Sequence, residues 1–600
     1  MLQREKKNSY PPLLQGLRGN HNGSFEIAHK LGREKEKFSI KDLPIFENYD
    51  LVIVGAGISG LSAARFYQKK FGNEKKILIL DNHDDFGGHA KRNEFIINKK
   101  LILAYGGTES LQSPKSIYSK IAINLLDDIG VNIDELGKCF NRNFYSEMGL
   151  SRGVFFNKET FGVDKLINGD PARVIADDVD PKHLNGKSYQ NFIKEFPFSA
   201  EDKISLVSLF TKKINYLPNF SEKECLKYLA ETSYRDYLIN NVKLSKHVAL
   251  FFQAKSSDFY ANGIDGVSAL DARNLGVPGL DGLNIPKLSG VGKAELEDPY
   301  IYHFPDGNSS LARLLVRKMI PAVALGNTMH DVVLANFDYS KLDLPSNHVK
   351  LRLNSTVVHA YNEKNSVNIG YFDHSGKLIR VKGNQVIMAG YNMMIPHIIP
   401  EISNIQKDCL AKNIKANIVY SKVVIRNWQS FFKAGVHEIY SPTMTYCRVK
   451  LDYPVNIGGY EHSKSPNDPI CLHMTYVPTV LDPSLDARTK SKLGRYKLLG
   501  MSFADFEKDI RNQLQRMLGT YGFNHEKDIL AITVNRWSHG YSYTFNSLYD
   551  KETEVDKIIT AARTKVGNIT IANSDSSWIP FTHSAIDMAF RAVNELTVNS

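Results

Sequence analysis

The alternation of apolar and polar positions predicts βαβ units at both ends of the chain. Residues 49–54 form a β-branched apolar run typical of a central parallel strand. A glycine-rich turn, a helical pattern over residues 61–70 and a second apolar run over residues 76–80 follow it directly. Near the other end, residues 569–571 indicate a short buried strand, and residues 584–596 place apolar side chains at helical spacing. Such elements at both ends predict a nucleotide-binding domain built from separated segments.

The segments between these ends are mixed in character. Residues 1–47 are polar and punctuated by proline and glycine, so they predict an arm that does not fold alone. Helical patterns over residues 116–129, 222–245 and 308–320 alternate with loop-rich stretches such as 261–292. A chain of 600 residues holds several structural units at the usual ~100–200 residues per domain.

The turn after the first strand carries the residues that a dinucleotide needs. Gly55 makes the sharp bend, Gly57 lets backbone N–H groups approach a pyrophosphate, and Gly60 permits close packing of the helix on the strand. Ser59 is a further candidate contact in this turn. Asp81 ends the second strand, where a carboxylate binds ribose hydroxyl groups. An acid there disfavours a 2′-phosphate, so the pattern predicts NAD or FAD rather than NADP.

The next stretch favours FAD over NAD. Gly87 and Gly88 follow the acid and are themselves followed by His89 and basic residues. FAD enzymes of the glutathione-reductase-like fold hold the pyrophosphate with this order of residues. The turn at Gly106 and Gly107 resembles the backbone that runs beside the flavin ring in the same enzymes. The sequence therefore predicts FAD in an α/β fold of the Rossmann type.

Composition and charge argue against several other classes of protein. The net charge is +11, but basic and acidic residues are interspersed and no nucleic-acid recognition motif is present. The five cysteines are widely spaced and never form a Cys-x-x-Cys pair, which argues against a disulfide framework and a thiolate metal site. No apolar run approaches the ~18–20 residues of a membrane span. We therefore expect no nucleic-acid partner, no membrane span and a cytoplasmic location, or a periplasmic one if the printed start lacks an export leader.

Several blocks of sequence together resemble one family. Residues 81–95, an acid-ended strand followed by the glycine pair and basic residues, resemble bacterial spermidine dehydrogenases of the flavin amine oxidase superfamily. Further blocks that fit this family lie along nearly the whole chain, at residues 10–29, 304–308, 390–396, 534–541 and 571–575. The resemblance implies FAD-dependent oxidation of a polyamine at a secondary amine, and a haem b bound with help from the N-terminal segment.

Under this resemblance the last block closes the FAD site. Asp575 would meet the ribityl chain, and Val357 and Thr582 would also contact the cofactor. The N-terminus of the 584–596 helix would face the flavin pyrimidine, where negative charge develops on reduction, and Thr582 and Ser584 would cap it. Residues 576–580 depart from the family pattern, because they are bulky where small residues let the backbone approach the flavin. We expect this departure to change flavin affinity or pocket shape, but not the fold.

Flavin-dependent amine oxidation needs a C–H bond aimed at flavin N5 and an unprotonated nitrogen. Aromatic and apolar walls favour both by orienting and desolvating the amine. Trp537 and Tyr541 are the candidate walls, because residues 534–543 resemble the segment that lines the flavin in this superfamily. Tyr543 is a weaker candidate, since a buried aromatic strand explains it equally well.

The resemblance also implies charged residues for the amine site. Lys422 stands where many flavin amine oxidases place a lysine that reaches flavin N5 through water. The alternative is a strand lysine that points to solvent. Glu109 and Glu461 are weak candidates for an acid that recognises a distal ammonium group.

His21 and His29 are the candidate haem ligands of the arm, by family analogy. The alternative is that each is a polar surface residue. No Cys-x-x-Cys-His motif is present, which excludes a covalent c-type haem. A haem would take electrons from reduced flavin one at a time and make the protein a dehydrogenase rather than a peroxide-producing oxidase.

The sequence thus predicts an FAD-dependent dehydrogenase of a spermidine-type polyamine. The alternatives are an FAD-dependent desaturase of an apolar substrate and a flavin-fold binding protein without turnover. The electron acceptor and the oligomeric state stay open. The predicted fold is an FAD-binding Rossmann-type domain with an interleaved α+β substrate domain and an N-terminal arm. Its predicted parts are the arm (1–47), FAD-binding segments (48–110, 301–395, 556–600) and substrate segments (111–300, 396–555).

Overall fold

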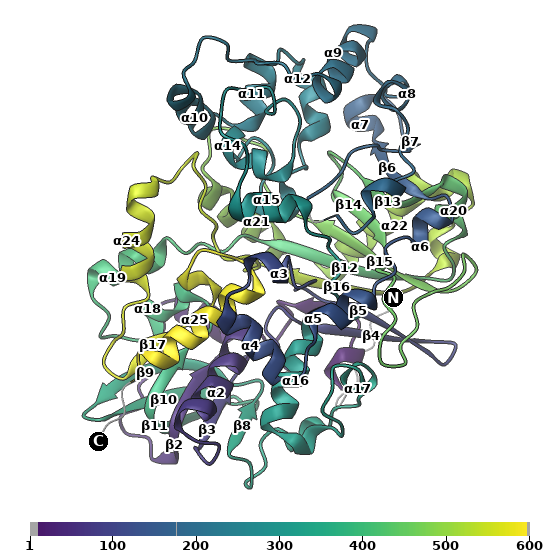
Figure 1. Cartoon of the computed structure of the whole chain (residues 1–600). Helices are drawn as coiled ribbons and strands as arrows, with labels where there is room; N and C mark the ends of the chain where they lie inside the picture. Colours follow the sequence, from purple (N-terminus) through teal and green to yellow (C-terminus); the bar gives the residue numbers. More distant parts are fainter. Residues whose placement is uncertain (1–9, 176, 597–600) are drawn as a thin grey trace.

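A computed structural model describes residues 10–175 and 177–596, which form two large sheets, a hairpin and the helices around them (Figure 1). One sheet lies at the lower end of the view beneath α2 (Ile58–Phe71) and α25 (Thr582–Asn594), and a layer of short helices covers the upper end. The second sheet lies between these two regions.

The first sheet joins strands from distant parts of the chain. Its order is β8-β3-β2-β11-β10-β9, and β17 pairs with β11. Strands β8, β3, β2, β11 and β17 run parallel to one another, whereas β10 is antiparallel to both of its neighbours. This arrangement confirms the predicted α/β fold of the Rossmann type. The strands are Ile45–Val54 (β2), Ile77–Leu80 (β3), Val349–Arg352 (β8), Thr356–Glu363 (β9), Ser366–Phe372 (β10), Leu378–Met388 (β11) and Ile569–Ile571 (β17).

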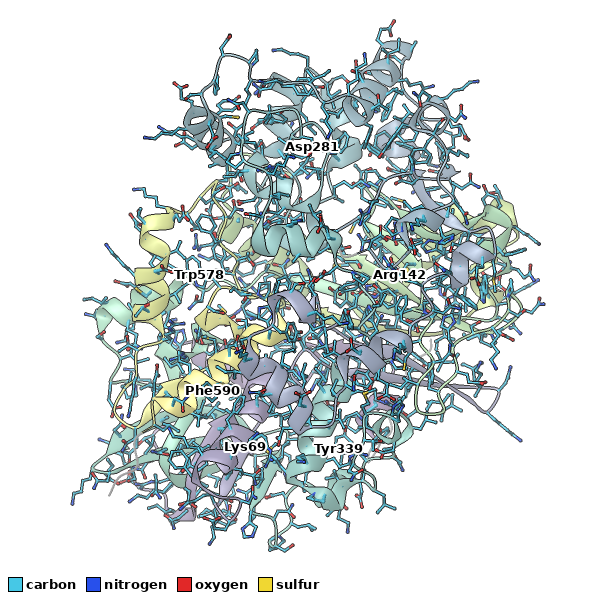
Figure 2. All side chains as sticks on the ribbon, viewed as in Figure 1. Lys69, Arg142, Asp281, Tyr339, Trp578 and Phe590 are labelled. Atoms are coloured by element: carbon cyan, nitrogen blue, oxygen red, sulfur yellow. The ribbon has the colours of Figure 1, made fainter. Side chains whose placement is uncertain are left out.

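Helices from both ends of the chain cover one face of this sheet. α2 begins directly after the glycine turn, and α25 packs beside it. The rings of Phe66 on α2 and Phe590 on α25 meet edge to face with centroids 5.2 Å apart; Phe590 is labelled in Figure 2. The C-terminal helix therefore belongs to the same unit as the N-terminal βαβ segment.

The second sheet is larger than the first and joins strands from both ends and the middle of the chain. Its eight strands follow the order β1-β16-β12-β15-β14-β13-β6-β7. β12 lies between β15 and β16 and is antiparallel to both. A separate hairpin of β4 (Arg92–Ile97) and β5 (Lys100–Tyr105) leads to the second glycine turn. The strands of the second sheet are Gly16–Gly19 (β1), Ser151–Phe156 (β6), Lys165–Asn168 (β7), Ile418–Ile425 (β12), Val436–Tyr440 (β13), Arg448–Leu451 (β14), Ile470–Tyr476 (β15) and Ile529–Trp537 (β16).

The described part of the arm is ordered against the body. β1 adds a parallel strand to the edge of β16. Arg18 on this strand forms an ion pair with Asp84 at 2.7 Å, and Arg536 donates to the carbonyl oxygen of Asn20 at 2.6 Å. A short helix, α1 (Glu26–Gly32), follows. The polar composition predicted a segment that does not fold alone, and its order here comes from these contacts with the body.

The predicted helices exist with adjusted limits. The 116–129 and 308–320 patterns correspond to α4 (Lys120–Asp128) and α16 (Ser309–Met319). The helical pattern over 222–245 corresponds to two helices, α10 (Glu222–Glu231) and α11 (Tyr234–Asn240). Ser233 interrupts the run by accepting a hydrogen bond from the Asp236 N–H as the N-cap of α11. Within residues 10–175 and 177–596, no helix combines the length and apolarity needed to cross a bilayer.

Candidate active site

A cavity of about 500 Å³ lies where the Rossmann sheet, the arm and the second sheet meet. Gly55, Gly57 and Asp81 line it on the side of the Rossmann sheet. Trp537 and His89 line the opposite end. Further predicted contacts in its lining are Ser59, Gly87, Gly88, Val357 and Thr582. We refer to it below as the dinucleotide cavity.

The glycine turn is built so that no side chain could replace its key glycines. Gly55 has φ +108°, which disfavours other residues, and a Cβ on Gly60 would overlap the Gly55 carbonyl oxygen. Gly88 approaches Gly57 so closely that a Cβ on Gly88 would stand 2.9 Å from the Gly57 Cα. Gly57 is the N-cap of α2 and supplies no side-chain cap. The free N–H groups at this helix end therefore face the cavity, as a pyrophosphate requires.

Asp81 lies at the carboxyl end of β3, in the wall of the dinucleotide cavity. Its carboxylate accepts hydrogen bonds from the backbone N–H groups of Ala56 at 2.6 Å and His83 at 2.9 Å. Burial raises its pKa, although Lys91 and these two N–H groups act in the opposite direction. The two bonds fix the carboxylate, which has lone pairs left for ribose hydroxyl groups.

The second glycine turn lies under Trp537. The Trp537 indole N–H donates to the Gly106 carbonyl oxygen at 2.7 Å. A Cβ on Gly106 would stand 2.7 Å from the Asn535 Oδ1 atom, and one on Gly107 would overlap the His89 carbonyl oxygen. The His89 ring meets the Trp537 ring edge to face at 4.8 Å and donates from Nε2 to the His539 carbonyl oxygen at 2.8 Å. His89 and Trp537 thus line the dinucleotide cavity, and Gly106 and Gly107 lie directly behind them.

Asp575 lies immediately behind that end. Its carboxylate accepts from the Lys415 ammonium at 2.6 Å and from the Asn392 N–H at 3.1 Å. Lys415 itself lines the cavity, as do Thr582 and Ala585 at the start of α25. The expected caps are wrong: α25 has no side-chain cap, and the Thr582 hydroxyl instead accepts from the Asn308 side chain at 2.9 Å. A second uncapped helix N-terminus therefore opens into the same cavity.

The bulky 576–580 stretch directs its largest side chain away from the cavity. Trp578, labelled in Figure 2, has φ +56° and is 2% exposed. Its indole N–H donates to Asn413. Its ring packs edge to face against Tyr543 at 5.0 Å. Pro580 is the residue of this stretch that lines the dinucleotide cavity. The departure from the family pattern therefore leaves the cavity open.

The arm supplies a further wall, and it separates the two predicted haem ligands. His29 lines the dinucleotide cavity together with Phe25, with ring centroids 4.9 Å apart. His21 lies outside that lining, and its Nδ1 atom bonds to the Gly19 carbonyl oxygen at 2.8 Å. Among residues 10–175 and 177–596, no cluster of three or more His, Cys, Asp or Glu side chains could hold a metal ion. A single axial ligand needs no such cluster, and His29 is the better placed of the pair.

Lys422 lies in the middle of β12 and does not point to solvent. Its side chain is fully buried, its ammonium donates to His473 Nδ1 at 2.9 Å, and it stands 3.0 Å from the centroid of the Tyr105 ring. Burial lowers its pKa to about 8. Because Tyr105 immediately precedes Gly106, Lys422 is positioned beside the second glycine turn.

Two of the predicted tyrosines have different surroundings. Tyr541 and Tyr420 of β12 share a hydrogen bond between hydroxyl groups at 2.7 Å, and both pack near Trp537. Tyr543 instead donates to Asp550 at 2.7 Å and stacks under the Arg488 guanidinium. Tyr420 and Tyr541 thus form an aromatic pair on the Lys422 side, and Tyr543 belongs to a separate cluster. Tyr420 was not predicted, although its place two residues before Lys422 in β12 puts both side chains on one face.

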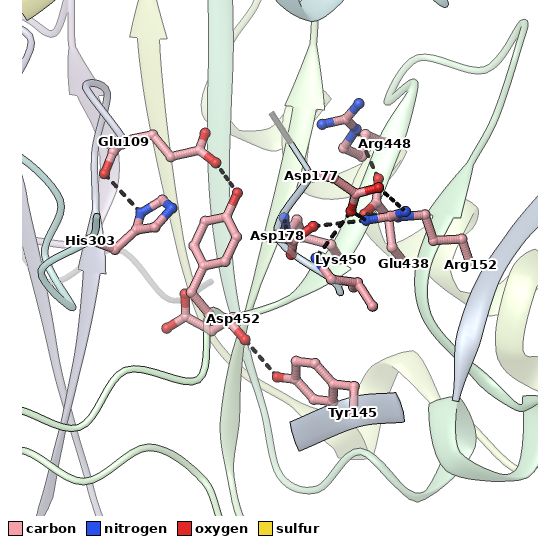
Figure 3. Close-up of polar contacts among 12 residues, drawn as sticks. Glu109, Tyr145, Arg152, Asp177, Asp178, His303, Glu438, Arg448, Lys450 and Asp452 are labelled. Atoms are coloured by element: carbon pink, nitrogen blue, oxygen red, sulfur yellow. Dashed lines mark hydrogen bonds and ion pairs between the residues drawn. The ribbon is translucent and has the colours of Figure 1, made fainter. Parts of the chain in front are cut away.

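Acidic groups surround Lys422 on the side away from the dinucleotide cavity. Glu109 accepts a hydrogen bond from the Tyr453 hydroxyl (Figure 3), whereas Glu461 is exposed and pairs with Lys464 at 2.9 Å. Burial raises the pKa of Asp452 to about 7, although the Lys422 charge acts to lower it. Asp452 and Tyr453 were missed from the sequence because no motif marks the loop after β14.

A chain of buried ion pairs continues from this point through β14, β13 and β6 (Figure 3). Lys450 contacts Asp178 at 3.3 Å, and Asp178 contacts Arg152 at 2.9 Å. Arg152 also pairs with Glu438, and Glu438 pairs with Arg448 at 3.1 Å. Since an unpaired buried charge is costly, the strands hold these groups in mutual contact. The second sheet is therefore charged rather than apolar around β6, β13 and β14.

Comparisons with known proteins establish the fold. A family model described as an NAD(P)-binding Rossmann-like domain matches residues 53–116. No curated protein matches the sequence. Wild-type putrescine oxidase bound to putrescine aligns at 14% identity with a TM-score of 0.52, covering 92% of this chain and 99% of that one. A protein assigned as a protoporphyrinogen oxidase, from Exiguobacterium sp. 255-15, aligns at 14% identity with a TM-score of 0.53, covering 92% and 98%. The chain therefore shares its fold with these two proteins over nearly its whole length.

Proposed function

We propose that the chain is an FAD-dependent amine oxidoreductase. The observation that carries this proposal is the position of three side chains next to the dinucleotide cavity. Lys422 and Tyr420 lie on β12, and Tyr541 follows β16 and bonds to Tyr420. Trp537, at the end of β16, closes the cavity. The adjacent strands β12 and β16 thus carry both a wall of the cofactor cavity and the polar side chains that would contact an amine. The fold shared with putrescine oxidase, a structure solved with putrescine bound, supports the same class of reaction.

The residues of the cavity fit FAD. The Gly55–Gly60 turn and the Gly87–Gly88 pair leave space for a pyrophosphate next to the N-terminus of α2. Asp81 would bind ribose hydroxyl groups, and Val357 lies in the same wall. Lys415 and the uncapped start of α25 would meet the other, negatively polarised end of the cofactor. When bound, FAD would accept a hydride from the carbon next to the amine nitrogen.

The residues around Lys422 would keep the substrate nitrogen unprotonated. An ammonium group cannot release a hydride, so the substrate nitrogen must be neutral. Tyr420 and Tyr541 supply an aromatic wall that disfavours charge by excluding water. Lys422, with its pKa lowered to about 8, and Asp452, with its pKa raised to about 7, hold or accept protons near neutral pH.

The substrate class we propose is a spermidine-type polyamine, on the family resemblance. Loss of a hydride and of the N–H proton converts the CH–NH unit to a C=N imine. Addition of water to the imine then gives an aldehyde and a shorter amine. Glu109, half-buried beside Tyr453, is the better placed acid for a distal ammonium group, because Glu461 is on the surface.

The alternative enzyme class, a desaturase of an apolar substrate, fits less well. Such a reaction favours a pocket lined by apolar groups without an aromatic pair. Lys422, Asp452 and Glu109 surround the centre instead, and the Tyr420–Tyr541 pair faces it. The non-enzymatic alternative depended on crowding by residues 576–580, and Trp578 lies outside the cavity lining.

The haem remains part of the proposal as an electron acceptor. His29 is the proposed ligand, since it lines the dinucleotide cavity together with Met394 and Leu499. Arg33 and Arg495 also line the cavity and would pair with haem carboxylates.

One spectroscopic experiment tests the proposal. Purified protein should show the absorption envelope of a bound flavin, and anaerobic addition of spermidine or a related amine should bleach it. Dithionite reduction serves as the reference for full bleaching. A sharp Soret band would show that haem is bound, and its absence would remove haem from the proposal. A flavin-loaded protein that no di- or polyamine bleaches would contradict the proposed reaction.

A further inference from the structure

A second cavity of about 380 Å³ lies between the layer of short helices and the β6–β13–β14 end of the second sheet. Its inner floor includes Glu438 and Tyr440 of β13 and Arg448 of β14. Aromatic side chains such as Phe251 and Phe259 form its walls. The dinucleotide cavity and this second cavity share none of their lining residues.

Lys255 is the inner cation of the second cavity, and it lacks a counter-ion. Its ammonium lies 4.2 Å from the centroid of the Tyr440 ring and 5.7 Å from that of Phe251. Among the described residues, no acid forms an ion pair with it; Asp170 and Glu438 act on its charge only from farther away. Burial lowers the pKa of Lys255, and the charges of Arg448 and Arg152 act in the same direction. A partly desolvated ammonium without an ion-pair partner is a binding site for an anion.

Asp258 connects this cation to the amine centre. Its Oδ2 atom pairs with Arg448 at 2.9 Å, whereas its Oδ1 atom is buried without a hydrogen-bond partner. Ala261, three residues further along, packs in one cluster with Tyr420 and Tyr541. The segment 255–261 therefore runs from the second cavity to the aromatic pair beside Lys422. The charges of Asp258 and Arg448 also act on the pKa of Tyr541, which burial raises.

The charge of the second cavity does not suit a free polycation. Six basic residues line it, against four acidic ones: Arg152, Arg173, Lys212, Lys213, Lys255 and Arg448 against Asp170, Asp258, Asp281 and Glu438. Lys212, Lys213 and Arg173 are exposed, so the outer part is predominantly basic; Asp281 lies there too and is labelled in Figure 2. Such a rim repels cations and attracts anions.

We propose that the second cavity binds a carboxylate at the far end of the amine substrate, with Lys255 as its counter-ion and Asp258 as the acceptor for an N–H group of the chain. This inference rests on amine oxidation at the Lys422 centre. It narrows the substrate to an amine that carries an acidic group. The basic rim would attract such a molecule to the cavity. The unpartnered Oδ1 atom of Asp258 would then accept a hydrogen bond from an N–H group of the part of the substrate that lies between Lys255 and Tyr541.

A matched pair of compounds tests the proposal on the flavin-loaded enzyme. One is spermidine; the other is its analogue in which the terminal aminomethyl group of the butyl arm is replaced by a carboxylate. We expect the analogue to bleach the flavin with an apparent second-order rate constant at least about tenfold higher, the value of one charge-assisted contact of about 1.4 kcal/mol. Equal rates, or a preference for spermidine, would overturn the inference while leaving amine oxidation intact.

The variant Lys255→Gln should abolish that preference. We expect it to lower the rate constant for the analogue about tenfold and not to lower that for spermidine, because only the analogue has a carboxylate to pair. Lys255→Arg should retain the preference. Lys246→Gln, an exposed lysine on α12 (Lys246–Ala249) outside the cavity lining, is the matched control and should change neither rate. An unchanged preference in a folded, flavin-containing Lys255→Gln protein would contradict the assignment of Lys255.

A binding measurement separates failure of this inference from failure of the proposed function. If no amine bleaches the flavin, the proposed reaction fails. Calorimetric titration with the carboxylate analogue then still tests the second cavity. Binding that weakens about tenfold in Lys255→Gln and not in Lys246→Gln supports the site, and binding that is absent or equal in both overturns it.

Discussion

The ammonium group of Lys422 lies 3.0 Å from the centroid of the Tyr105 ring. The lysine comes from β12, and the tyrosine ends β5 immediately before the second glycine turn. Burial disfavours the charged form of Lys422 and lowers its pKa to about 8, whereas the ring face favours an ammonium. The contact therefore holds a lysine that exchanges a proton near neutral pH beside the proposed flavin site.

Replacement of Lys422 by methionine should slow flavin reduction without releasing the cofactor. Proton handling by a positioned side chain contributes about 10²–10⁴-fold to a rate, so we expect a loss of at least about 100-fold. Flavin content and the visible spectrum should stay unchanged, because Lys422 does not line the dinucleotide cavity. Lys527→Met, at an exposed position before β16, is the control. Stopped-flow reduction by an amine is the measurement, and an equal rate in both variants would remove Lys422 from the mechanism.

The same lysine predicts the pH dependence of the reaction. Lys422 must be neutral to accept a proton, so the rate of flavin reduction at saturating amine should rise with pH and level off above about pH 8. The Lys422→Met variant should lack this step. Its slow residual rate should follow only the other ionisations of the bound complex. A step of the same position and size in both proteins would assign it to another group.

Gly60→Ala should release the cofactor, because the new methyl group would overlap the Gly55 carbonyl oxygen. Overpacking of this kind costs about 1–3 kcal/mol and would push α2 away from the turn. We expect a lower thermal midpoint and flavin that is lost on gel filtration. Gly500→Ala, at the end of α21 (Ala487–Gly500), is the control because its Cβ would meet nothing within 4 Å. Full flavin retention in Gly60→Ala would show that the turn tolerates a side chain.

The sequence predicted those parts of the site that lie close together along the chain. Gly55, Gly60 and Asp81 belong to one βαβ segment, and their spacing alone specifies how backbone and carboxylate meet a dinucleotide. Asp452 and Asp258 could not be predicted in this way. They come from separate segments: the pairing of β13, β14 and β15 brings Asp452 near Lys422, and the packing of residues 255–261 brings Asp258 near Tyr420 and Tyr541. Pairing of this kind leaves no local pattern.

The sequence also could not predict the direction in which some side chains point. Trp578 was expected to crowd the flavin because of its size alone, but a left-handed backbone at φ +56° turns it toward Tyr543. Residues 16–19 carry no alternation typical of a strand, yet β1 forms because β16 offers an unpaired edge. In both cases the tertiary partner, and not local propensity, decides the conformation.

Docking of the arm should depend on the ion pair between Arg18 and Asp84. Burial raises the pKa of Asp84, but the Arg18 guanidinium outweighs it and brings the pKa down to about 2 from an ordinary value of 3.8. At 1.36 kcal/mol per pKa unit, the pair contributes about 2 kcal/mol to docking. Because the folded-state pKa is the lower one, this contribution is present above about pH 4 and is lost as the pH falls through about 2.

Arg18→Ala should therefore destabilise the docking of residues 16–33 at neutral pH, as low pH should destabilise it in the parent protein. Hydrogen exchange of the amides in this segment is the measurement, and we expect about tenfold or greater acceleration from a loss of about 2 kcal/mol. Lys115→Ala is the control, because its ion pair with Asp134 is exposed to solvent. Unchanged exchange in Arg18→Ala would mean that the β1–β16 pairing alone holds the arm.

Trp578 should matter for stability and not for flavin binding. Its ring is buried against Tyr543 and below the Arg488 guanidinium, outside the lining of the dinucleotide cavity. Trp578→Ala should lower the free energy of unfolding by about 3–5 kcal/mol, the usual cost of deleting a buried aromatic side chain. Trp578→Phe should recover most of that loss, except for the hydrogen bond to Asn413. Both variants, at a temperature where they are folded, should bind flavin with the affinity of the parent, measured by fluorescence titration of the flavin-free protein. A large gain in flavin affinity on shortening Trp578 would show instead that its bulk restricts the cofactor site, as the sequence alone suggested.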